Sequence, residues 1–257
     1  AQYEAVGSDW AAFAAKPAGT GPFRIAEVVP RQYVRLERND DYWDPEGKAK
    51  LDAITLYPMP DPNTRLAALR AGLVDWIEAP PPDAIPGLEA AGFTISMKIY
   101  PHIWPYIFSV AEDSPLRDVR VRQAANYAVD RAGLVHLLNN TVEPASGYVP
   151  EGDVSYGKPA NHYTYDPEKA KALLAEAGYG PDRRVPLKVL TSASGGGQLM
   201  PVAMAQIIQQ NLNAVGFDVQ VEVLEWGQLV TAFRQESGSD IREGANAMNM
   251  SLSFPGP

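Results

Sequence analysis

Three consecutive segments in the last third of the chain decide the fold: VPLKVL (residues 185–190), a helical stretch (198–215) and FDVQVEVL (217–224). The last segment places Val219, Val221 and Val223 at alternate positions, as in a strand with one buried face. The middle stretch repeats apolar residues at spacings of three and four, as in a helix. Strand, helix and strand joined by one crossover predict a parallel pair with a right-handed connection. The chain is therefore predicted to be an α/β protein.

The segments before this unit add helices and one long connection. Residues 119–138 show helical spacing, with a break expected near Asp130. A further helix is predicted to begin with Asp166 as its cap and to end at Gly178. The connection over residues 139–163 is rich in glycine and proline, so it is either functional or wrapped over the surface.

The first 110 residues predict short elements. A short helix is expected after Ser8 as its cap, and Asp61 is expected to cap a helix that ends at Gly72. Residues 23–29 and 33–37 form a hairpin pattern around a proline-containing turn. Further strands are expected over residues 54–57, 74–77, 94–100 and 103–110. The tail over residues 244–257 offers no closing element, so the fold is expected to be unfinished there.

Composition excludes several classes of protein. The chain has 257 residues, 46% of them hydrophobic, which suffices for a buried core. The net charge is −9, and neither half is basic, which argues against nucleic acid or an anionic membrane surface as partner. No apolar run approaches the ~20 residues that span a bilayer. The absence of cysteine excludes disulfides, thiolate zinc sites and thiol nucleophiles.

The residues that most often carry catalysis or metal are not arranged for it. The three histidines, His102, His136 and His162, are isolated, without the spacing of a zinc site on one helix face. The run Gly195-Gly196-Gly197 precedes a helix but lacks the lysine of a phosphate loop. We therefore expect no metal site and no cofactor. Of the three histidines, His102 is of most interest, because it falls in the segment between the two halves of the chain.

Carboxylates leave one enzymatic alternative open. Two acids facing each other across a cleft, about 5 to 9 Å apart, could hydrolyse a glycoside. Each pair in this chain falls in a turn or at a strand end, where solvation is the ordinary explanation. The pairs are Asp40 with Asp41, Glu112 with Asp113, and Glu222 with Glu225.

Aromatic residues crowd the segment between the two halves of the chain. Tyr100, Trp104, Tyr106 and Phe108 lie within nine positions, and the last two share a face if this segment is a strand. They form either a packed interface between two units or the wall of a ligand cleft, because pockets favour aromatic linings at domain boundaries.

Seven phrases, in order, resemble one family. The chain is similar to the oligopeptide-, dipeptide- and nickel-binding class of ABC-importer solute-binding proteins, bacterial extracellular solute-binding protein family five. The likeness extends from about residue 19 to residue 226. The phrases are GTGPF (19–23), LERNDDYW (36–43), AALRAGLVD (67–75), PLRDVRVRQA (115–124), AVDR (128–131), YDPEKAKALLAEAGY (165–179) and LEW (224–226).

The resemblance implies a fold and a domain organisation. The fold is α/β and periplasmic-binding-protein-like (class II, peptide-binding type). Members are bilobal, close on a ligand by hinge motion, and are about twice this length. We therefore expect a fragment: residues 1–103 as part of lobe I, and residues 104–257 as most of lobe II without its C-terminal return.

The resemblance also implies site residues. The segment before the PLRDVRVRQA phrase lines the cleft in relatives, which assigns Tyr106 and Phe108, with His102 and Trp104 as further possibilities. Trp226 and Val230 are expected to face the same space. The segment that is often rich in tryptophan in relatives contains Ser251 and Ser253 here, without tryptophan or aspartate. Arg120 and Arg122 are expected to serve helix packing rather than the ligand.

The resemblance implies a non-enzymatic receptor that delivers a peptide-like or other small polar solute to an ABC permease in the membrane. We expect a monomer in the periplasm or lipid-anchored outside the cytoplasmic membrane, although the opening AQYEAVGSDW contains no secretory signal. Two alternatives stay open: a hydrolase that uses cleft carboxylates, and a solute sensor without a transport role. The solute itself is not identified by the sequence.

Overall fold

The computed structural model describes all residues except 1, 6, 16, 98–101, 148, 150, 153, 194–198, 236–244, 250–251 and 254–257. Contacts divide the chain into two compact units, Ala1–Pro60 and Asp61–Pro257. The expected lobe boundary after residue 103 is a different division and stays a prediction. The two units are described separately.

The first unit begins with two short helices, α1 (Gln2–Ala5) and α2 (Trp10–Ala15). The cap of α2 differs from the one expected. Asp9 accepts a hydrogen bond from the Ala12 N–H at 3.3 Å, whereas Ser8 adopts a left-handed backbone with φ of 60°. A carboxylate oxygen at this position satisfies an N–H group that the first helical turn leaves unpaired.

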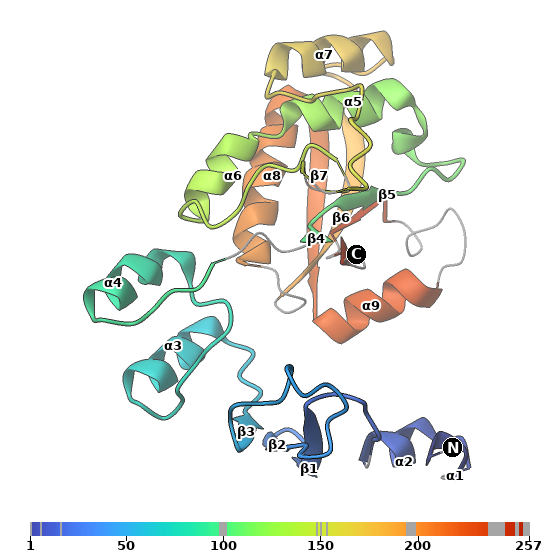
Figure 1. Cartoon of the computed structure of the whole chain (residues 1–257). Helices are drawn as coiled ribbons and strands as arrows, with labels where there is room; N and C mark the ends of the chain where they lie inside the picture. The colour runs from blue at the N-terminus through green and yellow to red at the C-terminus, as the bar shows by residue number, and fades with distance from the viewer. Residues whose placement is uncertain are drawn as a thin grey trace. The chain divides into compact units, whose positions relative to one another are not determined.

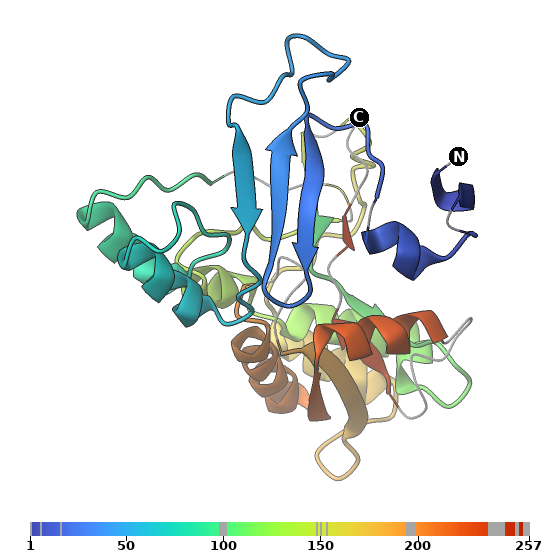
Figure 2. The ribbon, with the colours of Figure 1, turned by 90° about the horizontal axis from the view of Figure 1, so that it is seen from below.

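An antiparallel sheet completes the first unit. It contains β1 (Phe23–Val29), β2 (Tyr33–Arg38) and β3 (Ala53–Leu56) in that spatial order, and Figure 2 shows the three strands side by side. The predicted hairpin is confirmed: Phe23 lies opposite Arg38, and Val29 opposite Tyr33. Arg31 turns the chain with a left-handed φ of 63°.

The second unit starts with α3 (Pro62–Arg70), η1 (Pro82–Ala84) and α4 (Ile85–Ala90). The predicted cap is confirmed, because Asp61 Oδ1 accepts from Thr64 N at 2.7 Å, and Gly72 leaves α3 with φ of 68°. The strands expected over residues 74–77 and 94–97 are turns and extended loops instead. Neither segment has a paired strand in the described structure, and β-propensity without a partner does not form a strand.

A four-stranded mixed sheet forms the centre of the second unit. Its order is β5 (Tyr106–Phe108), β8 (Ala247–Asn249), β6 (Val185–Ser192) and β7 (Phe217–Leu224). The predicted parallel pair is confirmed, with Val185 opposite Phe217 and Ser192 opposite Leu224. The crossover helix α8 spans Pro201–Val215, and the expected start near residue 198 lies outside the described residues.

The expectation of an unfinished tail is wrong for residues 247–249. This segment, β8, lies inside the sheet, parallel to β6 and antiparallel to β5. All three residues are buried, so both faces are covered and no alternation of polar and apolar residues marks the strand. A two-stranded pairing of β4 (His102–Ile103) with β9 (Leu252–Ser253) follows along the same two segments.

Helices cover both faces of this sheet (Figure 1). The larger core cluster joins β6 and β7 to α5 (Val119–Ala128), α7 (Pro167–Glu176) and α8, with Phe217 and Val121 fully buried. The smaller cluster joins Leu190 and Met248 to Leu229 of α9 (Trp226–Gln235) on the opposite face. Successive residues of β6 and β8 alternate between the two clusters, as the pleat of a sheet requires.

The break predicted near Asp130 is confirmed. α5 ends at Ala128, α6 spans Arg131–Leu137, and Asp130 Oδ1 accepts from Gly133 N at 2.9 Å. At the other end of α5, η2 (Pro115–Arg117) precedes the Asp118 cap.

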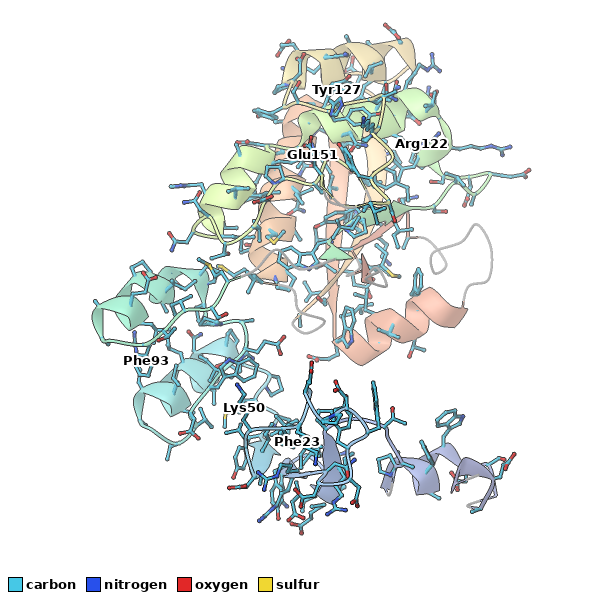
Figure 3. The ribbon with its side chains drawn as sticks, in the orientation of Figure 1. Phe23, Lys50, Phe93, Arg122, Tyr127 and Glu151 are labelled. Carbon is cyan, nitrogen blue, oxygen red and sulfur yellow. The ribbon has the colours of Figure 1, made fainter. Side chains whose placement is uncertain are left out.

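The long connection after α6 is tied to α5 by aromatic and polar contacts. Tyr163 meets the ring of Tyr127 edge-on, with centroids 5.1 Å apart, and Lys169 Nζ donates to the Tyr127 hydroxyl at 2.8 Å. Tyr127 lies on α5, next to α7, as Figure 3 shows. Arg122 donates to the carbonyl oxygens of Leu116 and Arg117, so it serves helix packing as expected.

We predict that Phe217→Ala lowers the free energy of unfolding by about 3–5 kcal/mol, because the ring is fully buried and its removal leaves a cavity. Chemical denaturation followed by circular dichroism measures the change. Val223→Ala on the same strand is the control: this side chain is 44% exposed, and its truncation should cost within about 0.5 kcal/mol. Equal losses in the two variants would contradict the core assignment.

Candidate functional site

The candidate site is the edge of the four-stranded sheet at which its parallel strands end. β6, β7 and β8 run in the same direction, so their last residues, Ser192, Leu224 and Asn249, lie at one edge. Open α/β sheets bind ligands outside the carboxyl ends of their strands. We call this region the carboxyl edge.

Two of the predicted site residues lie on β5, which borders β8. Tyr106 is opposite Asn249, the last residue of β8, so Tyr106 lies at the carboxyl edge. Phe108 is opposite Ala247 and is therefore further down the sheet. Both side chains are half-buried and pack against the larger cluster.

The other predicted residues reach the same edge by different elements. Trp226 opens α9 directly after β7, and Val230 lies one turn later on this helix. His102 and Ser253 are opposite each other in the pairing of β4 with β9. Trp104 connects β4 with β5, and Ser251 lies outside the described residues.

The structure brings Tyr106 and Trp226 to one edge but not to one face. Trp226 packs with Ile107 and Leu224 against the smaller cluster, whereas Tyr106 and Phe108 contact the larger one. A solute that touches both Tyr106 and Trp226 would therefore have to lie across the end of the sheet. Their roles as solute contacts stay predictions.

Three buried polar residues at the carboxyl edge escaped the sequence analysis. Thr191 and Ser192 are fully buried, and Asn249 is 4% exposed. Asn249 Nδ2 donates to the Pro105 carbonyl at 3.3 Å, and the Thr191 hydroxyl has no hydrogen-bond partner within the described residues. Buried polar groups without a partner are costly, so polar atoms of this kind cluster at sites more often than in cores.

Electrostatics support a neutral hydrogen-bonding edge. Burial raises the pKa of the Tyr106 phenol well above its ordinary value of 10, so its hydroxyl stays protonated at neutral pH. Within the described residues, no group of three or more His, Asp or Glu side chains could hold a metal ion.

One carboxylate of each predicted pair lies beside a cation. Asp40 pairs with Arg38 at 3.0 Å, Glu222 pairs with Lys188 at 2.9 Å, and Glu112 lies 3.8 Å from Arg117. These three carboxylates are engaged as ordinary solvated acids are.

The sequence of the chain matches a known family. The sequence profile of bacterial extracellular solute-binding proteins, family 5 (middle region), matches residues 1–253, so the chain belongs to this family. The resemblance noted in the sequence is thereby confirmed.

Two relatives and one structure illustrate the similarity. The di/tripeptide-binding protein 2 of Pseudomonas aeruginosa is 32% identical, over 84% of this chain and 40% of that protein. The oligopeptide-binding protein AppA of Bacillus subtilis is 31% identical, over 84% of this chain and 41% of its own length. The crystal structure of NikA from Brucella suis with Fe(III)-EDTA has a TM-score of 0.75 at 25% identity, covering 92% of this chain and 48% of NikA.

This chain thus spans less than half the length of these three proteins, and the two curated relatives are binding proteins by name. The family is one of extracellular proteins. Among the helices of the described residues, none has the length and apolar character needed to cross a membrane.

We predict that Tyr106→Phe removes one late-ionising tyrosine from an absorbance titration at alkaline pH. The raised pKa means that the folded state keeps this phenol neutral, so stability is present below pH 10 and falls as the pH rises through the ordinary tyrosine pKa. The variant should lose that part of the alkaline destabilisation. A titration curve identical to that of the unmodified protein would contradict the buried phenol.

Proposed function

We propose that this chain acts in the solute-binding component of an ABC import system. It would capture a peptide-like or other small polar solute in a cleft between two lobes and deliver the solute to a membrane permease. The observation that carries the proposal is the carboxyl edge, which holds Tyr106, Trp226 and the buried polar groups of two strands in a member of family 5.

Enclosure would provide the affinity. Closing a cleft removes water and strengthens each hydrogen bond inside it, while aromatic walls contribute apolar area. A solute shifts the equilibrium toward the closed state only by its differential affinity for that state. The neutral hydroxyls of Thr191 and Ser192 suit peptide groups, hydroxyls and amides.

The remaining parts of the proposal concern class, place and partner. We infer a binding protein rather than an enzyme, since the relatives named above are binding proteins and the candidate carboxylates are ion-paired. The place would be the periplasm or the outer side of the cytoplasmic membrane, with a lipid anchor as one form. The partner would be an ABC permease, and the binding protein would act as a monomer.

The test uses the complete product of the gene that encodes this chain. Isothermal calorimetry with dialanine, trialanine, reduced glutathione and nickel–histidine should detect binding of at least one of them. We predict that Tyr106→Ala and Trp226→Ala each weaken that binding by at least about tenfold, as for aromatic anchors at other interfaces. Both side chains also pack against core clusters, so the melting temperature is followed in parallel and binding is measured well below it, where each variant is folded.

Trp76→Ala is the matched control, because Trp76 is 71% exposed and lies far along the chain from the carboxyl edge. It should bind as the unmodified protein does. Unchanged affinity in both site variants would overturn the site assignment. Turnover of a peptide or glycoside by the purified protein would overturn the binding-protein class.

A further inference from the structure

Two chain segments form one ribbon beside the site. His102 and Ile103 pair with Ser253 and Leu252, and further along Tyr106 pairs with Asn249. The step from Ile103 to Tyr106 is as long as the step from Leu252 to Asn249, so both pairings share one register. Between the two pairings, Trp104 and Pro105 belong to no strand, and the residues opposite them lie outside the described residues.

Proline explains the interruption. Ser109 N donates to Asn246 O at 2.8 Å, which makes this pair a hydrogen-bonded one in the antiparallel ladder. Hydrogen-bonded pairs alternate along an antiparallel strand, so Ile107 and then Pro105 fall at positions whose N–H would point at the partner strand. Pro105 has no N–H, and the ladder loses a bond at this point.

A side chain adds a different cross-strand bond at the same point. Asn249 Nδ2 donates to the Pro105 carbonyl at 3.3 Å, from the residue directly opposite Tyr106. The Asn249 side chain is 4% exposed, so this contact is shielded from water. A buried amide stays where its hydrogen bonds are made, because an unsatisfied one costs free energy.

We propose that Asn249 is a positioning residue of the solute site: its amide bridges the ladder at Pro105 and thereby holds Trp104 and Tyr106 at the carboxyl edge. The effect on solute binding rests on the proposed function, whereas the effect on the ribbon does not. Asn249 acts through the backbone of Pro105 and the position of Tyr106, so it differs from the solute contacts predicted above.

The test is the isosteric variant Asn249→Asp. An ionised carboxylate cannot donate to the Pro105 carbonyl, but a protonated carboxyl can, and burial raises the pKa of such a group. At pH 8, amide hydrogen exchange over residues 102–108 should be about tenfold faster than in the unmodified protein. At pH 5, the ratio of the two rates should return toward one. Tyr106, the titratable side chain opposite, stays protonated throughout because its pKa is raised.

Asn246→Asp is the matched control. Asn246 lies just before β8, and its Oδ1 accepts from Lys188 N at 2.8 Å, a role that a carboxylate also fills. This variant should exchange like the unmodified protein at both pH values. If Asn249→Asp shows no acceleration at pH 8, or if Asn246→Asp shows the same pH-dependent acceleration, the proposal is wrong.

Calorimetry with trialanine and reduced glutathione tests the link to the site. For whichever of these binds the unmodified protein, Asn249→Asp should bind about tenfold more weakly at pH 8 and recover at pH 5. Faster exchange with unchanged affinity at pH 8 would overturn the positioning role. If the unmodified protein binds none of the four solutes named for the calorimetry, the proposed function fails, while the exchange measurement still decides whether Asn249 holds the ribbon.

Discussion

The parallel pairing of β6 with β7 and β8 is the constraint on which the second unit depends. Parallel strands must all leave the sheet at the same edge, so their connections and end residues gather there. Both faces of the sheet are then available to helices, which α8 and its neighbours cover on one side and α9 on the other. The carboxyl edge is what remains open to carry a site.

The edge differs in character from the sheet below it. Along β6, Val185, Leu187 and Val189 are buried in an apolar core, and Thr191 and Ser192 then follow, equally buried. Apolar packing stabilises the body of the strand, whereas two hydroxyl groups at its end add little stability and demand hydrogen-bond partners. In such a strand, the apolar body forms a rigid scaffold, and the hydroxyl groups at its end are placed for a polar site.

Pro105 and Asn249 show how an irregularity can be accommodated at such a site. A proline inside a ladder removes one backbone donor, and in a central position it would open the pairing. The Asn249 amide donates to the Pro105 carbonyl instead, so a side-chain bond joins the two strands beside the lost backbone bond. The irregular segment therefore remains ordered enough to place aromatic side chains beside the sheet edge.

Local patterns predicted the βαβ unit, the caps at Asp61 and Asp166, and the break between α5 and α6 near Asp130. They failed where pairing decides the structure. Residues 74–77 are β-prone but unpaired, and β8 is paired without any β pattern of its own.

The sequence likewise predicted some residues of the candidate site and missed others. Tyr106 and Trp226 stood out through the crowding of aromatic residues and through family phrases, whereas Thr191 and Asn249 carried no signal in the linear chain.

The sequence by itself determined the helices, the hairpin, the parallel crossover and the family, because periodicity, capping and recurrent phrases involve residues close together in the chain. Only the tertiary structure decided that β8 inserts between β5 and β6, that Asn249 meets Pro105, and that Tyr106 and Trp226 share an edge but not a face. The contacts of β8 with β5 and of Asn249 with Pro105 join residues more than a hundred positions apart, and burial on both faces erases the alternation that would have revealed the strand.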